Sequence, residues 1–131
     1  MLTRRLFTGC ALCAGLGLIA AGAEAQTAGV KREILRRQDL TGTNYECVLV
    51  RAEIAAGTLV ARHTHPGIES SYVLSGGLTL TVAGQGEHRL AAGQGFQVPP
   101  VTPHSARGGE APTLILVNYV VEKGKPLASP A

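Results

Sequence analysis

Residues 57–76 decide the fold, and they read GTLVARHTHPGIESSYVLSG. Side chains two positions apart in a strand project from the same face, so His63 and His65 are expected to point the same way. A Pro-Gly pair then turns the chain, and Glu69 follows at the start of the next expected strand, Ser70–Leu74. We therefore expect one hairpin to bring two imidazoles and a carboxylate together.

A third imidazole, His104, follows the proline-rich loop Pro99–Pro103. Three imidazoles and one carboxylate suit a first-row divalent metal ion such as Mn, Fe, Ni, Zn or Cu. Four protein ligands on an octahedral ion leave two positions for water, substrate or dioxygen, and open positions are typical of catalytic sites. The pattern therefore indicates one divalent metal ion. The fourth histidine, His88, lies in a polar strand and is expected to face solvent.

The sequence on both sides of this stretch is typical of many short strands. Seventeen Gly and seven Pro residues mark frequent turns. Residues 78–82 alternate apolar side chains with threonine, which is the period of a sheet with one buried face. The further strands that we expect are Glu33–Arg37, Tyr45–Ala55, Thr58–His63, Glu87–Leu90, Phe96–Val98 and Thr113–Val121. No segment has an apolar stripe at helical spacing, so an all-β sandwich or small barrel is expected.

Two spaced motifs resemble those of the cupin superfamily. The first consists of Gly57, His63-Thr64-His65, Glu69 and Gly76, and the second of Gly93, Pro99 and His104. This resemblance implies an all-β fold, a single cupin jelly-roll barrel (a double-stranded β-helix). It also implies that the four metal ligands are His63, His65, Glu69 and His104. The second motif departs from the family at Val101, where the family has glycine, and at Gly108, where it has asparagine.

The N-terminal residues have the three parts of an export signal. Arg4 and Arg5 precede an apolar run from Cys10 to Ala23, and a small-x-small sequence ends at Ala25. The paired arginines resemble a twin-arginine signal, which exports folded proteins; an ordinary secretory signal is the alternative. We expect a periplasmic or secreted protein. We expect no stable membrane span after processing, because the run is short and rich in Gly and Ala.

The expected organisation is a leader (1–25), an N-terminal arm (26–44), a cupin barrel (45–122) and a C-terminal tail (123–131). The tail has two prolines and a glycine and is expected to be loose unless a partner holds it. Residues 26–131 carry ten basic and eight acidic side chains, mostly scattered, so no nucleic-acid partner is expected. Cys47 is the single cysteine of this part and is expected to be a small buried hydrophobe.

The sequence has no Ser, Cys or Lys in a recognisable nucleophile motif, no phosphate-binding loop and no dinucleotide-binding fingerprint. Any chemistry must therefore come from the metal. No catalytic residue can be named, but two side chains are candidates for lining the cavity. Ser71 shares strand parity with Glu69, and Asn118 is the polar residue of its parity in its strand; Tyr72 should face away. The resemblance implies an enzyme that acts on a small organic molecule by dioxygenation, isomerisation or decarboxylation. A non-catalytic metal- or small-ligand-binding module is the alternative.

A homodimer is expected, because the apolar stretch Tyr45–Ala55 lacks strict alternation, which suggests that both its faces are buried. The resemblance further implies that residues near Glu33–Arg37 cross to the partner.

The leader bears on the identity of the metal. A chain that folds before export can take Mn or Fe from the cytoplasm, whereas one that folds outside would favour Zn or Cu, which bind more tightly.

Overall fold

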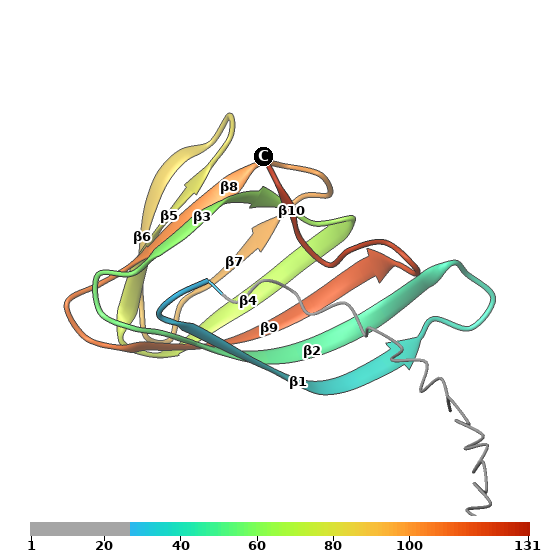
Figure 1. Ribbon diagram of the computed structural model, residues 1–131, viewed down its shortest axis with the longest axis horizontal. Coiled ribbons are helices and arrows are strands. Elements are labelled where there is room, and N and C mark those ends of the chain that lie inside the picture. The colour runs from blue at the N-terminus through green and yellow to red at the C-terminus, as the bar shows by residue number, and fades with distance from the viewer. Residues whose placement is uncertain (1–26) are drawn as a thin grey trace, which may run out of the picture.

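The computed structural model describes residues 27–131, and Figure 1 shows their arrangement. The expected leader, residues 1–25, lies outside the described residues. The ten strands are β1 (Val30–Asp39), β2 (Tyr45–Ile54), β3 (Leu59–Thr64), β4 (Gly67–Ser75), β5 (Gly77–Val82), β6 (Gly86–Ala91), β7 (Gly95–Val98), β8 (His104–Gly108), β9 (Thr113–Glu122) and β10 (Ser129–Pro130). The described part contains no helix, and therefore none that could cross a membrane.

The strands form two antiparallel sheets of five strands each. Sheet I has the order β1-β2-β9-β4-β7, and sheet II has the order β10-β3-β8-β5-β6. The chain changes sheet at most of its connections, from β2 in sheet I to β3 in sheet II and back to β4 in sheet I. The two sheets lie as curved layers facing each other (Figure 1). The expectation of an all-β jelly-roll barrel is confirmed.

The core lies between the inner faces of the two sheets. Along β9 burial alternates strictly from residue to residue, as expected for a strand with one buried face. The inward residues of sheet I include Val48, Val50, Ala52, Ile54, Ile115, Val117 and Val121, and those of sheet II include Val60, Leu78, Leu80 and Val82. The apolar alternation of β5 thus faces inward, as predicted.

Strand β2 has only one buried face within this chain. Val48 and Val50 are buried in the core, whereas Cys47 and Leu49, which alternate with them, are partly exposed on the outer face of sheet I. Burial of both faces was expected in a homodimer, and it stays a prediction. The expectation that Cys47 is buried is wrong within the described residues. The physical reason is that no other element of residues 27–131 packs on this outer face.

Both flanking segments belong to the sheets. The strand expected at Glu33–Arg37 is the longer β1, which pairs with β2 of its own chain and has an irregularity between Ile34 and Arg36. Contrary to the expectation of a loose tail, the tail is held by strand pairing. Its strand β10 pairs with His63 and Thr64 of β3, so the tail runs from β9 in sheet I across to sheet II (dark red in Figure 1).

Candidate metal centre

The three histidines of the centre come from one sheet and its edge. His63 lies in β3, His65 lies just after this strand, and His104 begins β8, where it is directly opposite His63. The pairing explains the geometry, because facing residues of neighbouring antiparallel strands have adjacent side chains. The ring centroids of His63 and His104 are 4.2 Å apart, and those of His63 and His65 are 4.8 Å apart.

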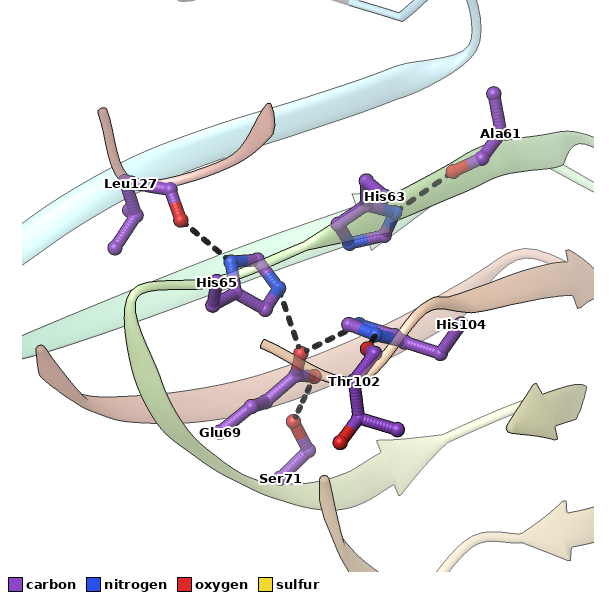
Figure 2. A network of polar contacts seen from close by, with 8 residues as sticks. All are labelled: Ala61, His63, His65, Glu69, Ser71, Thr102, His104 and Leu127. Carbon is purple, nitrogen blue, oxygen red and sulfur yellow. Dashed lines mark hydrogen bonds and ion pairs between the residues drawn. The ribbon is translucent and has the colours of Figure 1, made fainter. Parts of the chain in front are cut away.

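Glu69 reaches the histidines from the opposite sheet. The expectation of a hairpin is wrong, because β3 and β4 lie in different sheets and the chain turns a corner between them. The corner depends on Gly67, because a Cβ atom there would overlap the backbone of Val120. Beyond the corner Glu69 points inward, opposite Tyr119 of β9, and is almost fully buried. Figure 2 shows its carboxylate between His65 and His104.

Ser71 holds the Glu69 carboxylate from behind. The Ser71 hydroxyl donates a hydrogen bond of 2.8 Å to Glu69 Oε1. The other oxygen, Oε2, lies 2.9 Å from His65 Nε2 and 3.1 Å from His104 Nε2. The prediction that Ser71 faces inward is confirmed, but its hydroxyl orients the carboxylate instead of facing open space.

Backbone carbonyl groups set the orientation of all three imidazoles. Each ring has its Nδ1 atom within hydrogen-bond distance of a carbonyl oxygen, which can only accept, so Nδ1 carries the proton and donates. The acceptors are the carbonyl oxygens of Ala61 for His63 (2.7 Å), Leu127 for His65 (2.6 Å) and Thr102 for His104 (2.9 Å). The three Nε2 atoms are therefore left for the centre, and Figure 2 shows those of His65 and His104 beside the Glu69 carboxylate.

The four ligand atoms converge on one point. One nitrogen from each histidine and one oxygen of Glu69 all lie within 4.8 Å of one another. His65 Nε2 is buried and makes no satisfied hydrogen bond among the described residues, although it lies 2.9 Å from the carboxylate. With the proton on Nδ1, both atoms are acceptors and repel each other unless a positive charge lies between them. The residues therefore fit a divalent cation.

The electrostatics of the cluster agree with this interpretation. Burial lowers the pKa of His63 to about 4, so this ring is neutral at pH 7. Burial also raises the pKa of Glu69, but the His104 and His65 rings beside its carboxylate outweigh burial and hold the pKa well below its usual range. For His104 burial lowers the pKa, and the hydrogen bond with Glu69 more than compensates, so the pKa is raised. The centre thus attracts positive charge, whether a proton or a metal ion.

A cavity of about 240 Å³ opens beside the cluster. Its walls include His63, His65 and Tyr119, together with Leu127 and its neighbours in the tail. Tyr119 was not among the predicted site residues. Its ring centroid is 4.7 Å from that of His65, and its side chain faces inward on β9.

Asn118 does not line this cavity, contrary to the prediction. It neighbours Tyr119 on β9, so it lies on the outer face of sheet I, in a shallow groove with Leu49 and Leu116. Strand parity separates the two faces of β9, and the apolar residues that share parity with Tyr119 are the buried ones. Two other predictions are confirmed: Tyr72 faces outward and is 48% exposed, and His88 is exposed.

The family profile of the cupin domain matches residues 50–119. The chain belongs to the cupin family. The matched segment contains all four residues of the cluster. No curated protein matches the chain significantly.

Solved structures share the cupin fold at low sequence identity. The polyketide cyclase RemF from Streptomyces resistomycificus is 21% identical with a TM-score of 0.63, over 79% of this chain and 72% of that one. KdgF from Halomonas sp. is 23% identical with a TM-score of 0.60, over 73% and 83%. The DMSP lyase DddQ from Ruegeria pomeroyi is 21% identical with a TM-score of 0.61, over 68% and 44%. This cupin thus spans less than half of the lyase.

The two departures from the second cupin motif have structural explanations. Val101 has a φ angle of 53°, in the region that favours glycine, so the loop keeps the backbone shape at the cost of strain. Its amide donates to the carbonyl of His65 at 3.0 Å, which links this loop to the centre. At Gly108 a Cβ atom would lie 2.7 Å from the carbonyl oxygen of Ala55, so asparagine would not fit.

Proposed function

We propose that this cupin is a metal-dependent enzyme that acts on a small organic molecule by chemistry of the dioxygenase, isomerase or decarboxylase type. The observation that carries the proposal is the convergence of three Nε2 atoms and a carboxylate at the wall of a 240 Å³ cavity. A purely structural metal site is closed by protein ligands, whereas a site beside a cavity can admit a substrate. The similar folds of a polyketide cyclase and a DMSP lyase support an enzymatic role.

The residues of the site have distinct tasks in this proposal. His63, His65 and His104 would hold the ion through Nε2, and Glu69 would hold it through its carboxylate. The ion would supply Lewis-acid polarisation and a fixed position for substrate or dioxygen. Ser71 keeps Glu69 oriented through its 2.8 Å hydrogen bond, and three backbone carbonyls keep the imidazoles oriented. Tyr119 and Leu127 add surfaces that limit access of water to the cavity.

The test begins with elemental analysis of the protein purified from its native compartment. We expect about one equivalent of a divalent ion per chain, as the four-ligand cluster implies. A substrate screen with that ion restored should then give turnover, which chelation abolishes and re-addition of the ion restores. Tight binding of a small molecule that is recovered unchanged, with no turnover in the screen, would show a binding module instead and contradict the proposal.

We further propose that the protein is exported folded through its twin-arginine-like leader, already loaded with Mn or Fe. The proposal rests first on the arginine pair Arg4 and Arg5. It rests also on the mixed nitrogen and oxygen ligand set, which binds Cu or Zn more tightly than Mn or Fe. A chain that folded outside the cytoplasm would therefore take up Cu or Zn, and only folding before export would let it keep Mn or Fe. An Arg4→Lys/Arg5→Lys variant should stay in the cytoplasm, folded and metal-loaded. Replacing the leader with one for unfolded export should give periplasmic protein with Zn or Cu. Identical metal content with both leaders would show that the leader directs export but has no effect on which metal is bound.

A further inference from the structure

One arginine of β1 faces the same cavity as the metal cluster. Arg32 pairs with Ala52, which is buried, so its side chain lies on the inner face of sheet I. Arg32 lines the cavity together with His63 and His65. It also lines a smaller pocket of about 40 Å³ that continues inward to Glu69 and His104. The Arg32 side chain thus borders both spaces beside the candidate metal ligands.

The guanidinium of Arg32 has no partner among the described residues. Two other arginines of sheet I are paired on its surface: Arg37 lies 2.8 Å from Glu46, and Arg51 lies 3.0 Å from Glu33. Arg36 has no such partner among the described residues, but it is exposed to solvent. Arg32 is partly buried, yet its guanidinium takes part in no hydrogen bond or ion pair within residues 27–131. A partly buried charge without a counter-ion is unfavourable, and such a charge in a ligand cavity indicates that the ligand supplies the counter-ion.

The charge of the cavity strengthens this argument. Glu69 is the one acidic side chain that lines these two spaces, and it is directed at the histidine cluster. A divalent ion on that cluster leaves one net positive charge, Arg32 adds a second, and the exposed Arg62 at the wall of the cavity adds a third. The other walls are largely apolar, with Val60, Tyr119 and Leu127 among them, so little else screens these charges. The space therefore favours an anionic organic molecule.

We propose that Arg32 binds the carboxylate of a small organic acid, the substrate class of this site. A guanidinium offers two parallel donors that match the two oxygens of a carboxylate. The cavity of about 240 Å³ has room for a small acid whose remaining atoms extend toward the metal ligands. The part of the inference that makes this acid a substrate rests on the proposed function, whereas the binding of the carboxylate does not.

The experiment compares acids with their neutral amides as probes. Titration calorimetry of the Zn-loaded full chain with benzoate and benzamide, and with butyrate and butyramide, gives their affinities. We expect each acid to bind at least about tenfold more tightly than its amide, because one charge-assisted bidentate contact is lost in the amide. Equal affinities for acid and amide, or binding of inorganic phosphate but of neither acid, would overturn the proposal without any variant.

Variants then locate the contact. Arg32→Gln should remove the preference for the acid, and Arg32→Lys should retain part of it, because a lysine keeps the charge but loses the bidentate geometry. Arg36→Gln is the matched control, because it removes the same charge from an exposed position of the same strand. It should leave the preference unchanged. A preference that persists in folded Arg32→Gln protein would overturn the assignment.

The outcome is independent of the outcome for the proposed function. Binding of acids that depends on Arg32, without turnover of any acid, would contradict the enzyme and leave the carboxylate site in place. Turnover of a neutral substrate, with KM unchanged in Arg32→Gln, would support the enzyme and overturn the inference. With Mn in place of Zn, faster relaxation of the protons of bound butyrate would show that the acid lies beside the ion.

Discussion

The two sheets of this cupin contribute chemically different halves of one centre. Sheet II and its edge provide the three imidazoles of His63, His65 and His104, whereas sheet I provides the Glu69 carboxylate together with Ser71. Neither half has a complete ligand set. The centre therefore forms only when the sheets pack, and an ion bound there would link them across the core and stabilise the folded state.

The outer faces of the sheets differ as well. Sheet I exposes apolar side chains, including Tyr72 (48% exposed) and Leu74 (46%), beside a groove of about 540 Å³ lined by Leu49 and Leu116. Sheet II presents Thr79, Thr81, Arg89, Ser105 and Arg107 on its outer face. Exposed apolar patches often mark interaction sites, so the predicted homodimer is expected to use sheet I and leave sheet II in solvent.

The largest effect should come from removing the nitrogen ligands of sheet II. The His63→Ala/His104→Ala variant should lose bound metal completely while keeping its β-type circular dichroism spectrum, because half of the ligands are gone. Elemental analysis measures the metal content. His88→Ala, which removes an exposed histidine of the same sheet, should keep about one equivalent. A full equivalent of metal in the double variant would refute the assignment of the ligands.

Removal of the charge that sheet I supplies should have a smaller effect. Glu69→Gln keeps the shape but loses the negative charge, so the affinity for the ion should fall by about 100-fold and the metal preference should change. Competition titration against a chelator of known affinity measures both. Glu87→Gln, at an exposed position of sheet II, is the control and should leave the affinity unchanged. Equal affinities in the wild type and Glu69→Gln would show that the carboxylate is no ligand.

The difference between the outer faces predicts a difference between two matched substitutions. Tyr72→Glu places a charge on the apolar face of sheet I and should weaken dimerisation by about tenfold or more. Thr79→Glu places the same charge on sheet II and should have no effect. Light scattering over a series of micromolar concentrations gives the mass of each variant. A monomeric wild type under these conditions would contradict the dimer.

The smallest effect concerns the loop that joins β7 of sheet I to β8 of sheet II. Val101→Gly should raise the free energy of unfolding by about 1 kcal/mol, because relief of the strain at φ 53° exceeds the entropy cost of glycine. Thr102→Gly should lower it by about 0.5–1 kcal/mol, because that position is not among the positive-φ residues. Urea denaturation measures both. A Val101→Gly protein that is less stable than the wild type would show that removal of the valine side chain relieves no backbone strain.

The sequence by itself determined the four residues of the candidate metal cluster and most of the strands. These features are local: residues two apart in a strand share a face, and a period of two marks a strand with one buried side. His63, His65, Glu69 and His104 could therefore be named from their spacing and the family resemblance, and they converge in the structure. The turn-forming residues likewise placed the strand ends from β2 to β7 within a few positions.

Tertiary structure alone decided which face is inside and which distant segments meet. Parity divides β9 into two sets, but only the packing of the sheets places Tyr119 in the cavity and Asn118 outside it. The contact between the Leu127 carbonyl and His65 joins residues 62 positions apart, and nothing local in the tail predicts it. The sequence places Arg32 in a polar N-terminal arm, whereas its pairing with Ala52 in the structure places its side chain on the inner face of sheet I. Pairing between strands is non-local, so its register follows from the burial of the whole core and not from any single segment.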